Sequence, residues 1–181
     1  MKKLLIIMTS LLVITSCATT KEAKLARAEL RNEKKLAEQE IVKKAVESKR
    51  FIIKLDRLYF SNGGRIDLMP RANYIIVDGN NAIISAAYLG RQNEIKPIAA
   101  INLIGKTKNY QLTSFVSKGR YDIKMEVDNG KNSFDVYLRI NKNGTCNASF
   151  NTLRIDLVNY TGHLVPIKDK KNLPLKDSNI I

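Results

Sequence analysis

The chain has 181 residues, of which 44% are hydrophobic and 27% are charged, and its formal net charge is +14. This length allows one folded domain with an appendage, and this composition excludes a bundle of membrane-spanning helices and a low-complexity disordered polymer. There are two Cys and one His, so the sequence offers no Cys/His cluster for a metal and, with one Cys in a processing signal, no internal disulfide.

The first twenty residues have the pattern of a secretory signal peptide. Lys2 and Lys3 precede an apolar run that is shorter than the roughly 20 residues a membrane-spanning helix needs. The run ends in Ile14-Thr15-Ser16-Cys17, which resembles the lipobox of bacterial lipoproteins. We therefore expect residues 1–16 to be removed and Cys17 to carry a diacylglyceryl group. The alternatives are an ordinary signal peptide with a chance Cys, or a buried N-terminal strand.

A lipid on Cys17 would anchor the chain to a membrane. Each buried methylene contributes about 0.8 kcal/mol, so two or three acyl chains hold a protein almost irreversibly. The residue after Cys17 is Ala18, whereas Asp in that place signals retention at the inner membrane. In some Gram-negative gut bacteria, acidic residues directly after the Cys direct a lipoprotein to the cell surface. No acidic residue directly follows Cys17. The expected location is the outer membrane, facing the periplasm.

The segment after Cys17 has the composition of a charged helix. Residues 21–50 contain no Gly and no Pro, and they are rich in Ala, Leu, Glu, Lys and Arg, which are strong helix formers. Oppositely charged residues are spaced i,i+4, as in Glu40 and Lys44, which adds a few tenths of a kcal/mol per pair. We interpret residues 17–50 as a lipid-anchored helical spacer; a solvated helix packed loosely on the next domain is the alternative.

From Phe51 onward the pattern is that of short antiparallel strands. Turn signals recur, and apolar and polar residues alternate between them, as in an all-β barrel or sandwich. The clearest hairpin joins an apolar face at Tyr121, Ile123, Met125 and Val127 to one at Phe134, Val136, Leu138 and Ile140 through a turn that contains Gly130. The inward positions are bulky and predict a filled or narrow interior; they include Met125, Phe134, Leu138, Phe150 and Leu157.

Further strands are expected at 51–60, 73–78, 82–88, 97–106 and 110–117. Closing such a sheet removes its exposed edges, so a small β-barrel is a reasonable solution and a β-sandwich the alternative. The domain is expected to span residues 51–166, and residues 167–181 form a polar tail.

Several short motifs resemble the bacterial domain of unknown function 4251, found in lipoproteins of Gram-negative gut bacteria. They are Tyr74-Ile75-Ile76-Val77, Ala87-Tyr88-Leu89-Gly90-Arg91, Asn143-Gly144, and Arg154 followed by Tyr160-Thr161-Gly162-His163-Leu164. The family usually has Pro where this chain has Ala87. The resemblance implies a lipocalin-like antiparallel β-barrel, and it implies no activity or catalytic residue.

Few residues carry a chemical signal. Tyr88 and Arg91 are the candidate ligand contacts, because a guanidinium matches carboxylate or phosphate, although an ion pair at a strand end is the preferred interpretation of Arg91. His163 lacks a visible partner for acid–base work and is interpreted as a surface residue. Cys146 lies on an inward position, where a lone Cys behaves as a small apolar residue.

The sequence therefore predicts a non-catalytic binding or structural β-barrel module, tethered by Cys17 to the envelope. Its expected partners are membrane lipid and an unidentified envelope ligand or protein. No cofactor or metal is expected, and export beyond the cytoplasm argues against nucleic acid despite the basic charge. An envelope hydrolase acting on glycan or lipid is the alternative.

Overall fold

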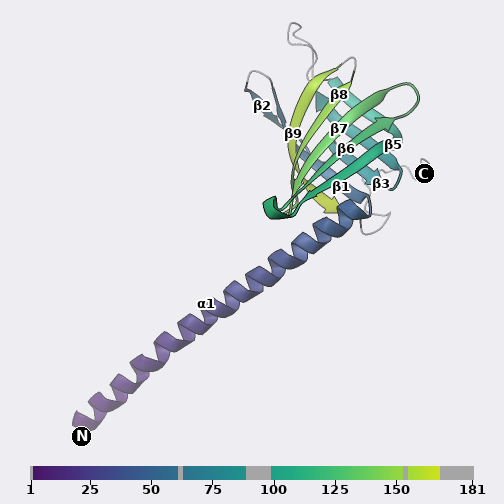
Figure 1. Cartoon of the computed structure of the whole chain (residues 1–181). Coiled ribbons are helices and arrows are strands. Elements are labelled where there is room, and N and C mark those ends of the chain that lie inside the picture. The colour runs from purple at the N-terminus through teal and green to yellow at the C-terminus, as the bar shows by residue number, and fades with distance from the viewer. Residues whose placement is uncertain (1, 61–62, 89–98, 153–154, 168–181) are drawn as a thin grey trace. The chain divides into compact units, whose positions relative to one another are not determined.

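A computed structural model describes the backbone of residues 2–60, 63–88, 99–152 and 155–167 (Figure 1). The side chains of residues 2–20 lie outside this description. The chain divides into two compact units, Met1–Ala37 and Glu38–Ile181, which are considered separately.

The first unit consists of most of helix α1 (Lys2–Glu47). The composition of this segment explains why it is helical, because no Gly or Pro interrupts the run of good helix formers. Leu25, Leu30 and Leu36 are each about two-thirds exposed, so this stretch does not bury a continuous apolar stripe in the protein itself. Within the part of the chain that is described, no helix combines the length and apolarity needed to cross a membrane.

The second unit begins inside the helix. Val42, Ala45 and Val46 are buried in the same apolar cluster as the strands. The Tyr110 hydroxyl donates a hydrogen bond of 3.0 Å to the carbonyl oxygen of Val46, and burial raises the pKa of Tyr110 above its usual value. The last turns of the segment expected to be a spacer therefore contribute to the folded core. The helix ends at Glu47, and Lys49 follows with a φ of +54°.

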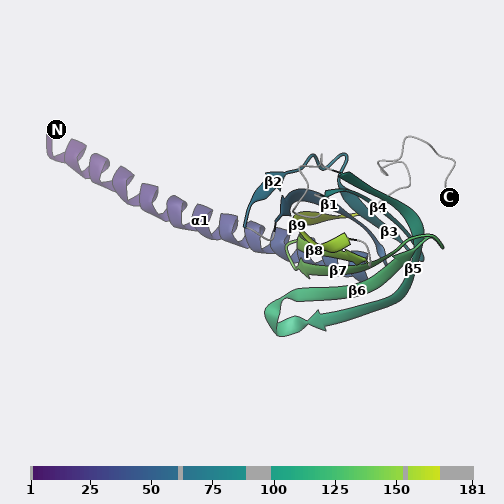
Figure 2. The same cartoon turned by 90° about the horizontal axis from the view of Figure 1, so that it is seen from above.

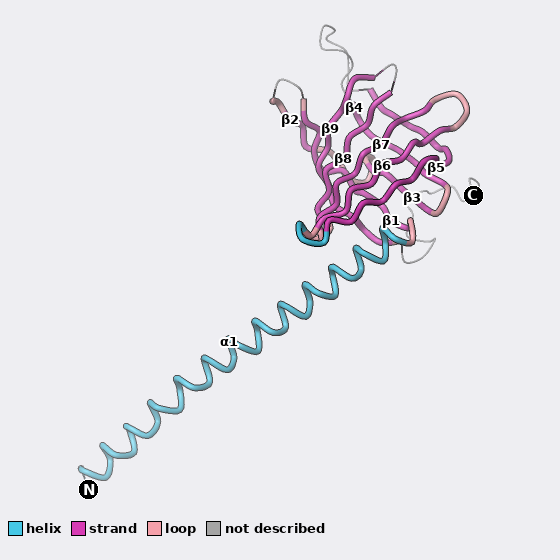
Figure 3. The backbone as a smooth tube through the Cα atoms, viewed as in Figure 1, coloured by secondary structure: helices cyan, strands magenta, loops and turns pink. Residues whose placement is uncertain are grey.

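The remainder of the second unit is a closed antiparallel sheet, whose strands are coloured magenta in Figure 3. The described strands are β1 (Arg50–Tyr59), β2 (Arg65–Asp67), β3 (Tyr74–Asp78), β4 (Asn81–Tyr88), β5 (Ala99–Phe115), β6 (Arg120–Asp128), β7 (Ser133–Asn141), β8 (Thr145–Thr152) and β9 (Ile155–Pro166), with a 3₁₀ turn at Val116–Lys118. They pair in the order β2-β1-β3-β4-β5-β6-β7-β8-β9, and β9 pairs back onto β1. Eight of them form the closed ring, while β2 adds to the end of β1. The predicted β-barrel is thus confirmed in preference to the sandwich.

The barrel interior is occupied by large side chains. In Figure 2 the strands curve round this interior, and the most deeply buried residues include Tyr160, Phe51, Phe150, Ile53, Leu55 and Leu58. The expected inward positions Met125, Phe134, Leu138 and Phe150 are all buried. The alternation of apolar and polar residues in β6 and β7 therefore predicted the inner face correctly.

The expectation for Leu157 is wrong, because this side chain is 58% exposed. The pairing of β8 with β9 shifts register between Phe150 and Thr152. Since side chains alternate with a period of two, a shift of one residue sends the following positions to the opposite face. In β9 the inward positions are instead Val158, Tyr160 and Leu164.

A second difference concerns the two strands expected at 97–106 and 110–117, which are a single long strand, β5. The interruption read from the sequence is a β-bulge: the pairing with β6 shifts register between Lys108 and Gln111, and Asn109 has a φ of +53°. A bulge of this kind bends a strand without ending it.

Candidate functional site on the outer face

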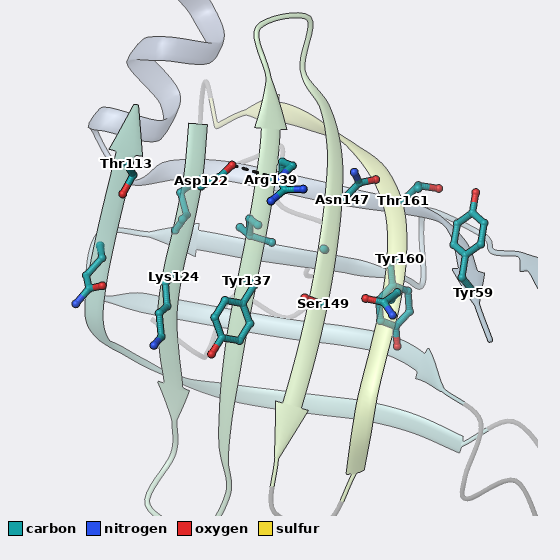
Figure 4. A pocket seen from close by; sticks show the side chains of 15 residues that line it. Tyr59, Thr113, Asp122, Lys124, Tyr137, Arg139, Asn147, Ser149, Tyr160 and Thr161 are labelled. Atoms are coloured by element: carbon teal, nitrogen blue, oxygen red, sulfur yellow. Dashed lines mark ion pairs between the residues drawn. The ribbon is translucent and has the colours of Figure 1, made fainter. Parts of the chain in front are cut away.

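A shallow hollow of about 700 Å³ lies on the outside of the barrel, across β5 to β9 and the end of β1. Figure 4 shows its side chains from outside, with Thr113 of β5 at one end and Tyr59 of β1 at the other. The side chains that reach into it are the outward members of strands whose inward members build the core. The same alternation that fills the interior therefore presents this polar surface.

Strand register arranges these side chains in two parallel rows. One row places Gln111, Lys124, Tyr137, Ser149, Asn159 and Tyr59 next to one another across six strands. The other row consists of Thr113, Asp122, Arg139, Asn147 and Thr161. We call these eleven residues the two-row surface. With neighbouring strands about 4.8 Å apart, the longer row follows an arc of roughly 24 Å.

The charged members of the two-row surface are engaged with neighbours. The carboxylate of Asp122 lies 3.0 Å from Arg120 Nε and 3.5 Å from Arg139 Nε. The Lys124 ammonium lies 5.6 Å from the centre of the Tyr137 ring, a cation–π contact. The single carboxylate is therefore held between two guanidinium groups, and the face of the surface is mainly uncharged.

Tyr59 forms the end of the longer row. Hydrogen bonds with Thr161 and Arg57 hold the pKa of Tyr59 below its usual value, since they stabilise the phenolate. Arg57 itself pairs with Asp67 of β2, with Nε 2.9 Å from Oδ1. This ion pair is well exposed and contributes little to stability, but it restricts the side chain beside Tyr59.

A smaller hollow of about 370 Å³ adjoins the first and shares Tyr59, Asn147 and Thr161 with it. Asp56 lines it, and its Oδ2 lies 3.1 Å from His163 Nδ1. Both side chains are nearly half exposed, so His163 is a surface residue as the sequence suggested. Among the residues whose side chains are described, no Ser, Thr or Cys is hydrogen-bonded to the His163 ring, and the pair therefore lacks an activated nucleophile.

Of the remaining sequence candidates whose side chains are described, Cys146 lines the smaller hollow and Tyr88 lines neither. Tyr88 is half-buried and packs against the core cluster, while Arg91 and the side chain of Cys17 fall outside the described residues. Cys146 is buried, and burial raises the pKa of its thiol, which favours the inert neutral form. Across the described ranges no group of three or more His, Cys, Asp or Glu residues could hold a metal.

Sequence reasoning missed the two-row surface. Its signal was present as outward Asn, Ser, Thr and Tyr residues at every second position of the predicted hairpins. The rows themselves run across strands, and their members are far apart in the chain. Only the register of pairing brings them together.

The fold and the outer hollow together define a small lipocalin-like antiparallel β-barrel protein with a hollow on its outer face. The family model for the domain of unknown function DUF4251 matches residues 33–164, and the chain belongs to this family. A crystal structure of a DUF4251 family protein from Bacteroides eggerthii is similar, with a TM-score of 0.64 and 14% identity over 72% of this chain and 89% of that one. In total three chains of solved structures match, while no curated protein does.

Proposed function

We propose that this protein is a lipid-anchored lipoprotein of the outer membrane, facing the periplasm, whose barrel binds an envelope partner without catalysing a reaction. The anchor is the diacylglyceryl group expected on Cys17. Support for it comes from the basic start, the short apolar run and the small residues before the Cys.

The observation that carries the binding role is the contrast between the interior and the exterior of the barrel. The interior holds a continuous cluster of buried side chains, including Val42 and Val46 from the helix, which leaves a carrier function without support. The two-row surface lines a hollow of about 700 Å³ outside. Partner recognition is therefore assigned to the outer face.

A non-catalytic role is supported by the chemistry of both hollows. Catalysis needs a nucleophile or acid–base pair that converges on a substrate site. Within the described part of the chain, the larger hollow has one carboxylate, Asp122, which two Arg side chains neutralise. The Asp56–His163 pair in the smaller region is open to solvent. Nothing here favours the hydrolase alternative.

The anchor predicts the behaviour of a Cys17→Ser variant. Because the serine hydroxyl does not accept the diacylglyceryl group, the variant is expected to lose all labelling by radioactive palmitate and to leave the membrane fraction. A Cys146→Ser variant is the matched control and should be labelled like the parent chain. Equal labelling of the Cys17→Ser variant and the parent chain would contradict the anchor.

The binding role predicts a position-specific contact in intact cells. A photo-crosslinking amino acid at Ser149, in the middle of the two-row surface, is expected to give a discrete crosslinked species. The same group at Asp135, which is exposed on β7 outside the hollow, should give none. Absence of a species from the Ser149 position, or the same species from both positions, would refute binding at this face.

A further inference from the structure

The ligand of the two-row surface can be inferred from the kinds of side chain that form it. Only Lys124, Asp122 and Arg139 of its eleven residues are charged. The others are hydroxyls of Ser, Thr and Tyr and amides of Asn and Gln, groups that both donate and accept hydrogen bonds. We infer that the surface binds a glycan chain that is recognised through its hydroxyl groups. This inference rests on the proposed binding role and adds the class of ligand.

The aromatic residues fit the same class. Tyr137 is 39% exposed, and Tyr59 stands three strands away in the same row. A tyrosine ring combines a flat apolar face with a polar tip. A sugar ring presents the matching combination, with a C–H face that packs on the aromatic ring and hydroxyl groups at its edge. Asn159 lies between the two tyrosines in the same row, and Asn147 lies in the neighbouring row.

The shape of the hollow favours an extended ligand. Small ligands occupy concave pockets that enclose most of their surface, whereas this hollow is partly open and lies on an outer sheet face. The longer row follows an arc of roughly 24 Å, from the 4.8 Å strand spacing. A chain of several sugar units lying across the strands would contact side chains from β5 to β1.

A peptide and an anionic polymer are less suited to this surface. Peptides bind sheets chiefly by adding a strand at a free edge. Strands β6 to β9, which carry most of the two-row surface, are paired on both sides. In β5 the pairing with β4 ends at Lys106, so the strand edge lies at one end of the surface and not beneath its two rows. A polyanion would be held by basic side chains. Here Arg139 already faces Asp122, and the Lys124 ammonium lies over the Tyr137 ring.

The inference can be tested with the full-length chain extracted in mild detergent and applied to immobilised oligomers. Three kinds of probe are compared: neutral oligosaccharides of glucan, mannan and galactan, acidic oligosaccharides of polygalacturonate, and unstructured peptides. Binding of at least one neutral oligosaccharide is expected, with longer oligomers binding more tightly. This binding should change little with ionic strength, because it does not depend on exposed charge pairs.

Variants locate the binding on the surface. Tyr137→Ala is expected to weaken neutral-glycan binding by about tenfold, since it removes one stacking ring, and Asn159→Ala to weaken it severalfold. Asp135→Ala, on the same strand as Tyr137 but outside the hollow, should bind like the parent chain. Thermal unfolding of each variant checks that folding is retained. Equal binding by Tyr137→Ala and the parent chain overturns the inference.

The other outcomes are equally decisive. Binding of the acidic oligomers or of the peptides alone overturns the glycan assignment. Binding of no probe, together with a crosslink from the Ser149 position in cells, overturns the glycan assignment and leaves the binding role intact. Binding of no probe without that crosslink overturns both.

Discussion

Replacing Phe150 by Ala is expected to lower the free energy of unfolding by about 3–5 kcal/mol, as large-to-small changes in a packed interior do. Phe150 is fully buried, and its ring centre lies 4.9 Å from that of Tyr160. The substitution removes both the buried apolar area and this ring contact. The cavity it leaves is bounded by strands locked in a closed ring, which limits their collapse.

Chemical denaturation followed by circular dichroism would measure this change, and the melting temperature should fall by roughly 10 °C. Asn151→Ala is the matched control, since Asn151 is the exposed neighbour on the same strand and surface changes stay within about 0.5 kcal/mol. If Phe150→Ala lowers the free energy of unfolding as little as the control does, the Phe150 ring is not part of the packed interior.

Replacing Gly162 by Ala is expected to destabilise the seam where β9 closes onto β1. A Cβ atom at this position would overlap the carbonyl oxygen of Lys54 and lie 3.0 Å from its carbonyl carbon. These are backbone atoms of the paired strand, next to the register shift between Leu55 and Arg57. They cannot rotate away as a side chain would, so the strands must separate locally.

Overpacking of this kind costs about 1–3 kcal/mol and occasionally more. The loss should appear in denaturation curves, and hydrogen exchange should speed up at β1 and β9 amides more than at those of β6 and β7. Asn159→Ala is the control, because it places the same methyl side chain at an exposed position of the same strand. It should leave the hydrogen exchange of the β1 and β9 amides unchanged. Parent-like exchange at the seam in Gly162→Ala would contradict the close approach.

The β6–β7 hairpin was the most predictable part of the fold. Its apolar residues repeat every second position, and its turn contains Gly130, which adopts a φ of +86°. The Asn129 side chain accepts hydrogen bonds from the backbone N–H groups of Lys131 and Asn132. Local residues carry this information, because the turn and the alternation are both short-range properties.

Errors arose where the chain departs from strict alternation. The bulge at Asn109 made one strand look like two, and the shift near Thr152 reversed the orientation expected for Leu157. A bulge is stabilised by the pairing of its neighbours, which a single strand does not reveal. The burial of Val42 and Val46 was missed for a related reason, since a charged helical segment shows no sign of the barrel it contacts.

By itself the sequence determined the class of the fold, the family resemblance and the turn positions, since these follow from patterns within a few residues. It also carries the lipobox-like segment at Cys17 that the proposed anchor depends on. Only the tertiary structure decided which strands meet and so which side chains share a surface. Tyr59 and Asn159 are one hundred positions apart, yet they are direct cross-strand neighbours, because closing the ring joins its first strand to its last.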